Sequence, residues 1–277
     1  MHRPAPPVVV FSHANSFPAS TYRVLLDALR NRGFEVHAID QFGHDPRYPV
    51  TNNWPHLVEQ LSDFVKPIAK NGPVFLLGHS LGGFLSMMTA AHHPRWVSGV
   101  VMLDSPLVAG WRANLLRLSK HMSLADKLSP GSVSRKRRHQ WSSLEEARAH
   151  FQSKKMFMRW DPEVLEDYLQ HGTHDAQTPE GMKRVLSFDR DIETAIYNTL
   201  PDHIERYLRK HPLQCPAALI GGIQSKELKQ GGLHFTRRIT HGRIMMIDGT
   251  HLFPMERPQL AASAIETALL SLQIGVR

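Results

Sequence analysis

A glycine-rich turn between a buried strand and a helix constrains the fold of this chain more than any other segment. The apolar run Val74–Leu77 leads into the residues Gly-His-Ser-Leu-Gly-Gly at positions 78–83, and a helical stretch of small residues and methionine follows. A serine that presents its hydroxyl on a tight strand-to-helix turn needs glycines beside it, because larger side chains would collide there. The N–H groups at the start of the helix favour negative charge. The segment therefore predicts an α/β fold with Ser80 as a nucleophile.

Other short apolar runs alternate with helical patterns in a way that is typical of a parallel sheet covered by helices on both faces. Most of these runs are continuous rather than alternating, as expected for strands buried on both sides. The predicted strands are Val8–Phe11, Glu35–Ile39, Val74–Leu77, Val100–Leu103, Ala217–Ile220 and Ile244–Ile247. We therefore expect an α/β fold with a mostly parallel sheet of about six strands flanked by helices.

The alternation of strands and helices stops after Leu103 and resumes only at Ala217. Helical patterns dominate the segment between them. The predicted helices are Leu144–Phe151, Glu163–Leu169, Met182–Leu186 and Ile204–Leu208. The expected organisation is a core domain of residues 1–106 and 212–277, with a helical cap of residues 107–211 inserted after the fourth strand.

The turn at 78–83 resembles the nucleophile elbow of the esterases and lipases of the α/β-hydrolase family. The resemblance covers nearly the whole chain except the predicted cap. It implies the α/β-hydrolase fold and a catalytic triad in the chain order serine, acid, histidine. By the same resemblance, Asn15 and Leu81 would supply the two backbone N–H groups of an oxyanion hole, although Ala14 replaces a glycine that the family usually has.

His251 is the expected general base, because it lies on the loop just after the last predicted strand, where the family places its catalytic histidine. His13 is interpreted instead as a residue that stabilises the loop after the first strand. Both assignments depend on position in the topology, since the chain has 18 histidines and one histidine alone indicates little.

The acid of the triad is left open by the sequence. Most of the family carries an aspartate after the penultimate strand, and Ser225 holds that position here. Asp104, at the end of the fourth strand, is one candidate, because some branches of the family carry their acid there. Glu227 is the other, since its longer side chain lies two residues past the usual site. The third possibility is that neither acts.

The serine at the elbow indicates acyl transfer, in which Ser80 attacks a carbonyl and His251 takes the proton. Carboxylesterase is the broadest expectation, with a small-molecule ester as substrate. Thioesterases, lactonases and C–C bond hydrolases share the machinery. The alternative from another class is a catalytically silent binding protein that has lost its acid. No cofactor and no metal site are predicted, because the chain has neither a phosphate-binding glycine loop nor a metal-ligand spacing.

Composition excludes several other classes. With 42% hydrophobic and 21% charged residues, the 277-residue chain is typical of globular proteins. No run approaches the roughly 20 apolar residues of a membrane span. The one cysteine, Cys215, excludes an internal disulfide framework. These features led us to expect a cytoplasmic protein.

The formal net charge of +8 is concentrated in one stretch. Between residues 127 and 159, nine basic side chains are opposed only by Glu145 and Glu146. The densest part is the cluster Arg135–Arg138. We interpret this cluster as a solvated surface rather than a nucleic-acid site, because no nucleic-acid-binding motif accompanies it. No nucleic-acid partner is expected.

Overall fold

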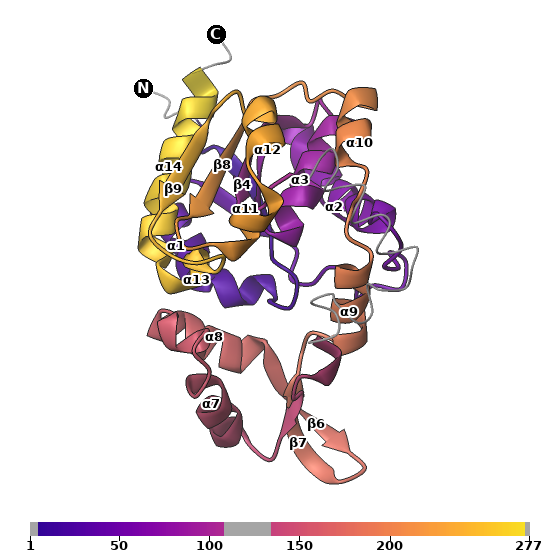
Figure 1. Ribbon diagram of the computed structural model, residues 1–277, viewed down its shortest axis with the longest axis vertical. Coiled ribbons are helices and arrows are strands. Elements are labelled where there is room, and N and C mark those ends of the chain that lie inside the picture. The colour runs from indigo at the N-terminus through magenta and orange to yellow at the C-terminus, as the bar shows by residue number, and fades with distance from the viewer. Residues whose placement is uncertain (1–4, 108–133, 275–277) are drawn as a thin grey trace.

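The computed structural model describes residues 5–107 and 134–274 of the chain (Figure 1). Its main sheet has six parallel strands in the order β2-β1-β3-β4-β8-β9. The strands are β1 (Val8–Ser12), β2 (Glu35–Ala38), β3 (Val74–His79), β4 (Val97–Leu103), β8 (Ala217–Gly222) and β9 (Ile244–Ile247). All six predicted strands are therefore confirmed, and the sheet is parallel throughout.

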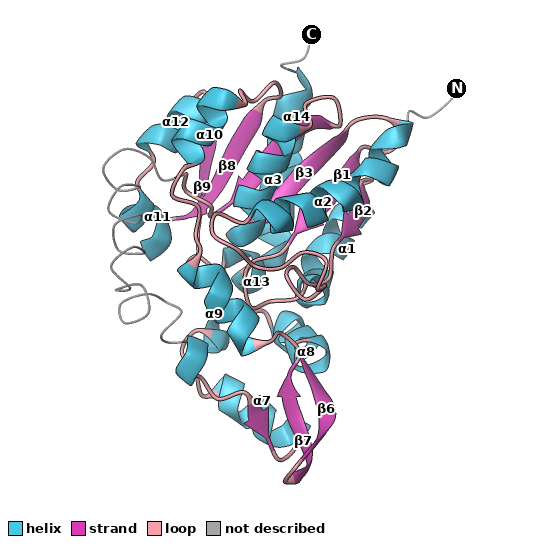
Figure 2. Cartoon of the chain, turned by 90° about the vertical axis from the view of Figure 1, so that its right-hand side faces the viewer, coloured by secondary structure: helices cyan, strands magenta, loops and turns pink. Residues whose placement is uncertain are grey.

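Helices cover both faces of this sheet, which can be followed in Figure 2. On one face α1 packs against α14, and α14 also contacts β4, β8 and β9; on the other face α3 packs on β3 and β4, with α2 and α10 beside it. The helices of the sheet region are α1 (Arg23–Asn31), α2 (Pro55–Ile68), α3 (Leu81–His92), α10 (Ile204–Lys210), α11 (Lys226–Gly231), α12 (His234–Ile239), α13 (Phe253–Glu256) and α14 (Pro258–Ile274). Two short 3-10 turns adjoin these helices: η1 (Ala19–Tyr22) directly precedes α1, and η2 (Ala69–Asn71) directly follows α2.

Successive residues of a central strand point to opposite helical layers. Val9 and Phe11 belong to the apolar core beside α1 and α14, whereas Val10 belongs to the core beside α2 and α3. All three side chains are fully buried. This alternation explains why the strands read as continuous apolar runs, since each face of the sheet needs its own hydrophobic layer.

Residues 134–198, within the segment between β4 and β8, form a separate lobe at the end of the molecule away from both termini (Figure 1). Helices α7 (Leu144–Gln152), α8 (Pro162–His171) and α9 (Arg190–Asn198) dominate its described part, with the 3-10 turn η3 (Phe157–Arg159). Three short antiparallel strands complete it in the order β5-β7-β6: β5 (Gln140–Trp141), β6 (Thr173–Thr178) and β7 (Gly181–Leu186). Residues 108–133 of the predicted cap, with Lys127 of the basic stretch, lie outside the described residues.

The helix predicted over Met182–Leu186 was wrong, because this segment is strand β7. A tight turn that contains Gly181 at φ +103° folds β7 back onto β6. Arg184 and Leu186 are buried while Lys183 and Val185 between and beside them are only partly buried, which is the two-residue period of a strand. The buried Arg184 disguised that period in the sequence, since arginine is an unusual residue for an inward-facing position.

No helix within the described ranges is both long enough and apolar enough to cross a lipid bilayer.

Candidate active site

Ser80 sits in a strained turn between β3 and α3. Its backbone has φ +51° and ψ −113°, a conformation that residues other than glycine seldom adopt. The Ser80 N–H donates to the carbonyl of Leu103 at 2.9 Å, which ties the turn to the end of β4. Strain of this kind persists only where the surrounding structure holds it, and it is common at functional sites.

The glycines around Ser80 are required by close backbone approach. A Cβ atom on Gly82 would lie 2.0 Å from the carbonyl oxygen of Ser12, and one on Gly78 would lie 2.1 Å from the carbonyl oxygen of Gly82. A Cβ on Gly83 would lie 2.1 Å from the Oγ of Ser105. No side chain fits at these distances, so the glycine pattern follows from the geometry of the elbow.

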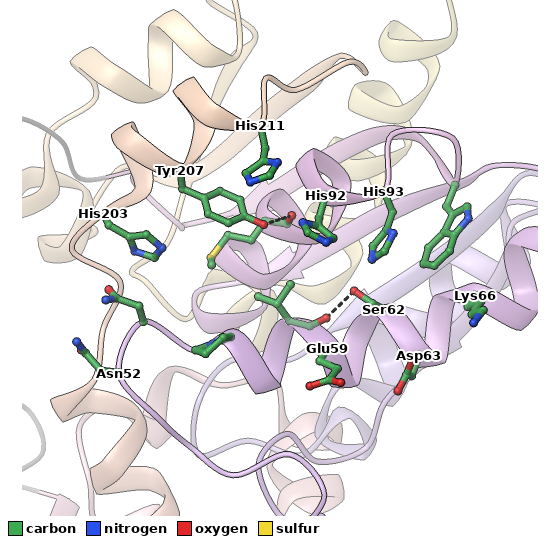
Figure 3. Close-up of a pocket in the computed structure, with 15 residues that line it drawn as sticks. Asn52, Glu59, Ser62, Asp63, Lys66, His92, His93, His203, Tyr207 and His211 are labelled. Atoms are coloured by element: carbon green, nitrogen blue, oxygen red, sulfur yellow. Dashed lines mark hydrogen bonds between the residues drawn. The ribbon is translucent and has the colours of Figure 1, made fainter.

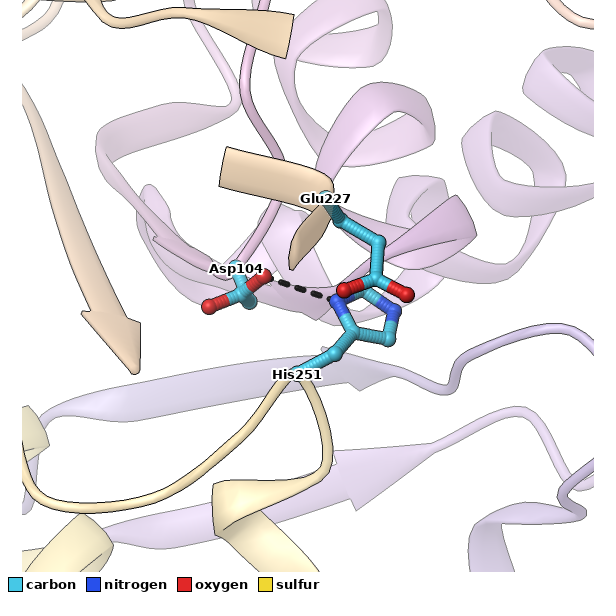
Figure 4. Close-up of side chains that lie close together, drawn as sticks. All are labelled: Asp104, Glu227 and His251. Carbon is cyan, nitrogen blue, oxygen red and sulfur yellow. Dashed lines mark hydrogen bonds and ion pairs between the residues drawn. The ribbon is translucent and has the colours of Figure 1, made fainter. Parts of the chain in front are cut away.

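His251 and Asp104 meet at the same edge of the sheet (Figure 4). The Nδ1 of His251 lies 2.7 Å from the Oδ1 of Asp104, and Asp104 is 1% exposed. The other carboxylate oxygen of Asp104 accepts from the backbone N–H of Gly222 at 2.8 Å. Asp104 itself has φ +47°, so it lies in the left-handed region at the end of β4. The arrangement holds the imidazole in one orientation with its Nδ1 toward the carboxylate.

Ser225 supports Asp104 rather than leaving a gap in the site. Its Oγ donates to the Oδ1 of Asp104 at 2.6 Å and also accepts from the N–H of Leu228 at 3.1 Å, which caps α11. The residue at the family's usual acid position is therefore a hydrogen-bond donor to a carboxylate that comes from a neighbouring strand.

Glu227 lies close to the same pair but makes no hydrogen bond to His251 in the described structure. Ligand atoms of Asp104, Glu227 and His251 lie within 4.8 Å of one another, and Glu227 is exposed (Figure 4). Three such groups can in principle hold a cation, but both oxygens of Asp104 already accept hydrogen bonds, one of them from the imidazole. These contacts fit a carboxylate that orients the imidazole of His251 better than they fit a cation site.

The N–H groups of Asn15 and Leu81 have no hydrogen-bond acceptor among the described residues. Leu81 begins α3, and the neighbouring Gly82 N–H donates to the carbonyl of His13 at 3.1 Å, which brings the loop after β1 against the elbow. Two free N–H groups next to a serine can stabilise an oxygen that gains negative charge. Within the described chain, the Ser80 hydroxyl makes no hydrogen bond to His251; such contacts are often long before substrate binds.

A buried relay that sequence reasoning missed joins the loops of the site. The N–H of Ala14 donates to the Tyr22 hydroxyl at 3.1 Å, and that hydroxyl lies 2.7 Å from the Nδ1 of His79. The Nε2 of His79 lies 2.9 Å from the carbonyl oxygen of His251. Burial lowers the pKa of His79 to about 3, so the ring is neutral and its Nε2–H donates while its Nδ1 accepts.

His13 is a second buried, neutral histidine, and it holds backbone in the described loops. Its Nε2 accepts from the N–H of Phe42 at 3.0 Å, so its Nδ1–H donates to the carbonyl of Ala14 at 2.7 Å. Burial lowers the pKa of His13 to about 4. This agrees with the interpretation of His13 as a residue that stabilises its loop.

Ser80 and His251 line one cavity of about 320 Å³, which we call the Ser80 cavity. The other residues that line it are Ala14, Asn15, Ser16, Phe17, Arg137, Met156, Glu193, Tyr197, Gln224, Lys226, Glu227, Thr250 and Leu252. Arg137 departs from the interpretation of its basic cluster as a solvated surface, because it reaches this cavity and pairs with the buried Glu193 at 3.3 Å. Arg138 remains on the surface, where it pairs with Glu146.

A larger cavity of about 610 Å³ lies between α2, α3 and α10 (Figure 3). It shares no lining residue with the Ser80 cavity. We call it the His92 cavity, and its wall carries His92, His93, His203, His211, Tyr207 and Trp96. Sequence reasoning did not find it, because its histidines come from helices that are far apart in the chain.

Comparison with known proteins shows which family and which relatives the chain is similar to. The profile of the alpha/beta hydrolase family matches residues 9–264. The chain is 33% identical over 107 residues to pyrethroid hydrolase of Sphingobium wenxiniae, with 36% of each protein covered. It is 34% identical over 110 residues to mouse monoglyceride lipase, with 37% of this chain and 36% of the lipase covered. These matches span about a third of the curated relatives.

A solved structure agrees over almost the whole chain. The crystal structure of E-2-(acetamidomethylene)succinate hydrolase superimposes with a TM-score of 0.69, covering 95% of this chain and 91% of that one, at 19% sequence identity. At that identity the likeness concerns the fold.

Proposed function

The chain belongs to the α/β-hydrolase family, and on that premise we propose that it is a serine hydrolase that cleaves carboxylic esters of small or medium size. The observation that carries the proposal is the 2.7 Å hydrogen bond between Asp104 and His251, which line up at the same sheet edge as the strained Ser80. Ser80 and His251 also line one cavity, where a substrate can reach both.

In the first half of the proposed reaction, the Oγ of Ser80 attacks the ester carbonyl while the Nε2 of His251 takes the hydroxyl proton. Asp104 accepts from the Nδ1–H of His251, so it fixes the tautomer and stabilises the imidazolium. The N–H groups of Asn15 and Leu81 hold the negative oxygen of the tetrahedral intermediate, each contributing on the order of 3 kcal/mol. Collapse of the intermediate releases the alcohol, which takes the proton from His251, and leaves the acyl group on Ser80.

In the second half, His251 removes a proton from water, and the resulting attack on the acyl group passes through the same oxyanion contacts. The carboxylic acid leaves and Ser80 regains its proton. Every proton in this cycle moves between substrate, water, Ser80 and His251, so the steps need no further group.

Asp104 is our proposed acid, in preference to Glu227. It is buried, and it accepts hydrogen bonds from Gly222 and Ser225 as well as from His251. Glu227 is exposed and has no hydrogen bond to the imidazole in the described structure. The hydrogen bond from Ser225 to Asp104 supports a serine hydrolase over a catalytically silent binding protein, because the acid that is missing at Ser225 is supplied by Asp104 in the proposed site.

Selection among esters is assigned to the predicted cap, residues 107–211. Arg137, Met156 and Glu193 all come from this segment and line the Ser80 cavity. A cavity of about 320 Å³ is at the small end of ligand sites, which favours short acyl and alcohol groups. Thioesters, lactones and C–C bonds next to a carbonyl use the same chemistry and stay as alternatives within the class.

The test is hydrolysis of p-nitrophenyl esters from acetate to dodecanoate by wild type and Ser80→Ala. We expect turnover that is highest with short acyl chains and falls on the order of 10⁶-fold in Ser80→Ala. Fluorophosphonate should label wild type and not the variant. Folded wild-type protein that hydrolyses no ester and resists fluorophosphonate would overturn the proposal in favour of a silent binding protein.

A further inference from the structure

Two loops of the proposed site start from strands that are not neighbours. The oxyanion loop, residues 13–18 with Asn15, follows β1, and the base loop, residues 248–252 with His251, follows β9. Strands β3, β4 and β8 lie between β1 and β9 in the sheet, so strand pairing does not fix one loop relative to the other. The proposed reaction needs both loops placed around Ser80 to within about 0.5 Å. Another contact must therefore hold them together.

Hydrogen bonds on both sides of Ala14 determine where the N–H of Asn15 points. The Ala14 N–H donates to the Tyr22 hydroxyl at 3.1 Å. The Ala14 carbonyl accepts from the Nδ1–H of His13 at 2.7 Å and from the N–H of Phe17 at 3.3 Å. That carbonyl and the Asn15 N–H belong to one planar trans peptide unit, so they point in opposite directions. Fixing Ala14 therefore fixes the direction of the proposed oxyanion donor.

His79 carries the connection from Tyr22 to the base loop. The Tyr22 O–H donates to the Nδ1 of His79 at 2.7 Å, and the Nε2–H of the same ring donates to the carbonyl of His251 at 2.9 Å. Tyr22 and His79 are at most 1% exposed, so water does not compete for these bonds. Burial lowers the pKa of His79 to about 3 and raises the pKa of Tyr22, so the ring stays neutral and the hydroxyl keeps its proton. One fixed order of donors and acceptors thus runs from Ala14 to His251.

Packing alone does not require a hydroxyl and an imidazole at these two positions. Tyr22 lies in the apolar core beside α1 and α14, with its ring centroid 4.7 Å from that of Phe11, and the His79 ring lies 6.5 Å from that of Phe253. Replacing both partners of a buried hydrogen bond by apolar groups of the same shape is often nearly neutral for stability. What the polar pair adds is a tie between two backbone groups, each at or next to a residue of the proposed site.

We propose that Tyr22 and His79 are positioning residues that hold the oxyanion loop and the base loop in a set geometry around Ser80. Tyr22 sets the direction of the Asn15 N–H, and His79 sets the backbone of His251. Neither Tyr22 nor His79 is among the residues that line the Ser80 cavity, so both act through other groups. The role rests on the proposed serine hydrolase activity, because it explains how two groups of that reaction keep their distance.

The first test removes the Tyr22 hydroxyl. In Tyr22→Phe the N–H of Ala14 and the Nδ1 of His79 both lose their partner. We expect kcat for p-nitrophenyl butyrate to fall about 10- to 10²-fold with KM within about twofold, since a misdirected oxyanion donor should cost less than a missing one. The matched control is Tyr207→Phe, which removes a hydroxyl that donates to the carbonyl of Met88 and should keep kcat within about twofold. Equal kcat in wild type and Tyr22→Phe would overturn the proposal.

An inhibitor pair distinguishes a misdirected N–H group from a loss of folded protein. With 1,1,1-trifluoro-2-hexanone, the Oγ of Ser80 adds to the carbonyl carbon, its proton goes to His251 and the carbonyl oxygen becomes an oxyanion. The alcohol 1,1,1-trifluoro-2-hexanol has no carbonyl to attack. In Tyr22→Phe we expect the inhibition constant of the ketone to rise about tenfold or more and that of the alcohol to stay within about twofold, because only the adduct uses the oxyanion N–H groups. Two unchanged constants would indicate a merely structural role and overturn the proposal.

Two substitutions of His79 separate the two halves of the relay. His79→Asn keeps an acceptor near the position of Nδ1 and loses the donor to His251, whereas His79→Gln keeps a donor near the position of Nε2 and loses the acceptor for Tyr22. We expect each to lower kcat on the order of tenfold. Tyr22→Phe combined with His79→Gln should lose little more than Tyr22→Phe alone, because both changes remove the same hydrogen bond. Effects that multiply would show independent contacts and overturn the relay.

NMR keeps the relay and the proposed function distinguishable, because it needs no turnover. In Tyr22→Phe we expect shifts of the Asn15 amide signal and of the His251 imidazole proton that faces Asp104, and neither shift in Tyr207→Phe. Both shifts, in a protein whose wild type hydrolyses no ester, would support the relay and overturn the esterase. Hydrolysis by wild type, with both signals and kcat unchanged in Tyr22→Phe, would support the esterase and overturn the relay. A shift of the Asn15 signal alone would also overturn the relay.

Discussion

The His92 cavity is larger than the Ser80 cavity, but the Ser80 cavity carries the side chains that are arranged for catalysis in the proposed reaction. The His92 cavity has about twice the volume of the Ser80 cavity. In the larger one, Ser62 donates to the carbonyl of Val58 and Tyr207 donates to the carbonyl of Met88, so these hydroxyls serve the helices. In the smaller one, the Ser80 hydroxyl makes no hydrogen bond among the described residues. Hydrogen bonding therefore distinguishes the cavity that we propose as the active site better than volume does.

The histidines of the two cavities are held differently too. In the larger cavity, rings pack on rings: His93 stacks on Trp96 with centroids 3.9 Å apart, and His92 lies 5.4 Å from His211 (Figure 3). At the Ser80 cavity, His251 is oriented by a buried carboxylate. An imidazole needs that kind of orientation to move a proton in a set direction. If this contrast is functional, substitutions at the Ser80 cavity should lower kcat far more than substitutions at the His92 cavity.

The largest effect is expected from the carboxylate that orients His251. Asp104→Asn should lower kcat on the order of 10⁴-fold, because an amide stabilises the wrong tautomer of the imidazole. Steady-state hydrolysis of a short p-nitrophenyl ester measures it. Glu227→Gln serves as the comparison and should stay within a few-fold of wild type. The reverse pattern would transfer the role of the acid to Glu227.

A smaller effect is expected from the elbow glycines. Gly82→Ala places a Cβ against the carbonyl of Ser12, so the backbone beside Leu81 must move. We expect kcat to fall by about 10²- to 10³-fold, as for loss of one oxyanion donor, with about 1–3 kcal/mol lost in stability. Gly33→Ala is the control: its Cβ meets no atom within 4 Å, so it should cost stability through its φ of +90° without lowering kcat. Unchanged kcat in Gly82→Ala would argue against the oxyanion role of Leu81.

Acid should destabilise the protein through the buried histidines of the reactive side. Burial lowers the pKa of His13 to about 4 and that of His79 to about 3, below the 6.5 of an unfolded histidine. Their contribution to stability is complete above pH 6.5 and is lost as the pH falls toward these lower values. Each should remove on the order of 3 kcal/mol by pH 4.

Urea denaturation at pH 7, 5.5 and 4.5 measures this loss. His13→Gln should flatten the dependence of the unfolding free energy on pH, although it lowers stability at pH 7. His93→Gln, in the larger cavity, should leave the slope close to that of wild type, because His93 is only partly buried there. Identical slopes in wild type and His13→Gln would contradict the assignment of a neutral His13.

The smallest effect is expected in the larger cavity itself. His92→Ala should leave kcat/KM for short esters within about twofold of wild type, because His92 touches none of the residues that line the Ser80 cavity in the described structure. The same ester assay measures it. A loss of more than tenfold in correctly folded protein would show that the two cavities are coupled.

How far the sequence could predict this site depends on how local each feature is. The elbow at Ser80 and the loop position of His251 follow from neighbouring residues, and the six strands follow from apolar runs. The choice between Asp104 and Glu227 does not, because it requires the ends of β4 and β8 to lie side by side. The relay through Tyr22 and His79 joins residues 57 positions apart, and no short pattern signals such a contact.

The insertion of the lobe of α7, α8 and α9 between β4 and β8 has an evolutionary consequence. These strands are hydrogen-bonded neighbours, so the long segment between them starts and ends within the same small region of the sheet. The entropic cost of closing such a loop grows only logarithmically, by about 0.6 kcal/mol for each doubling of length. The N–H of Gly222 at the end of β8 donates to Asp104 at the end of β4, which joins the two strands where the inserted segment is attached. The lobe can therefore be lengthened, shortened or exchanged while the reacting groups keep their positions, so that new specificities can arise on an unchanged chemical core.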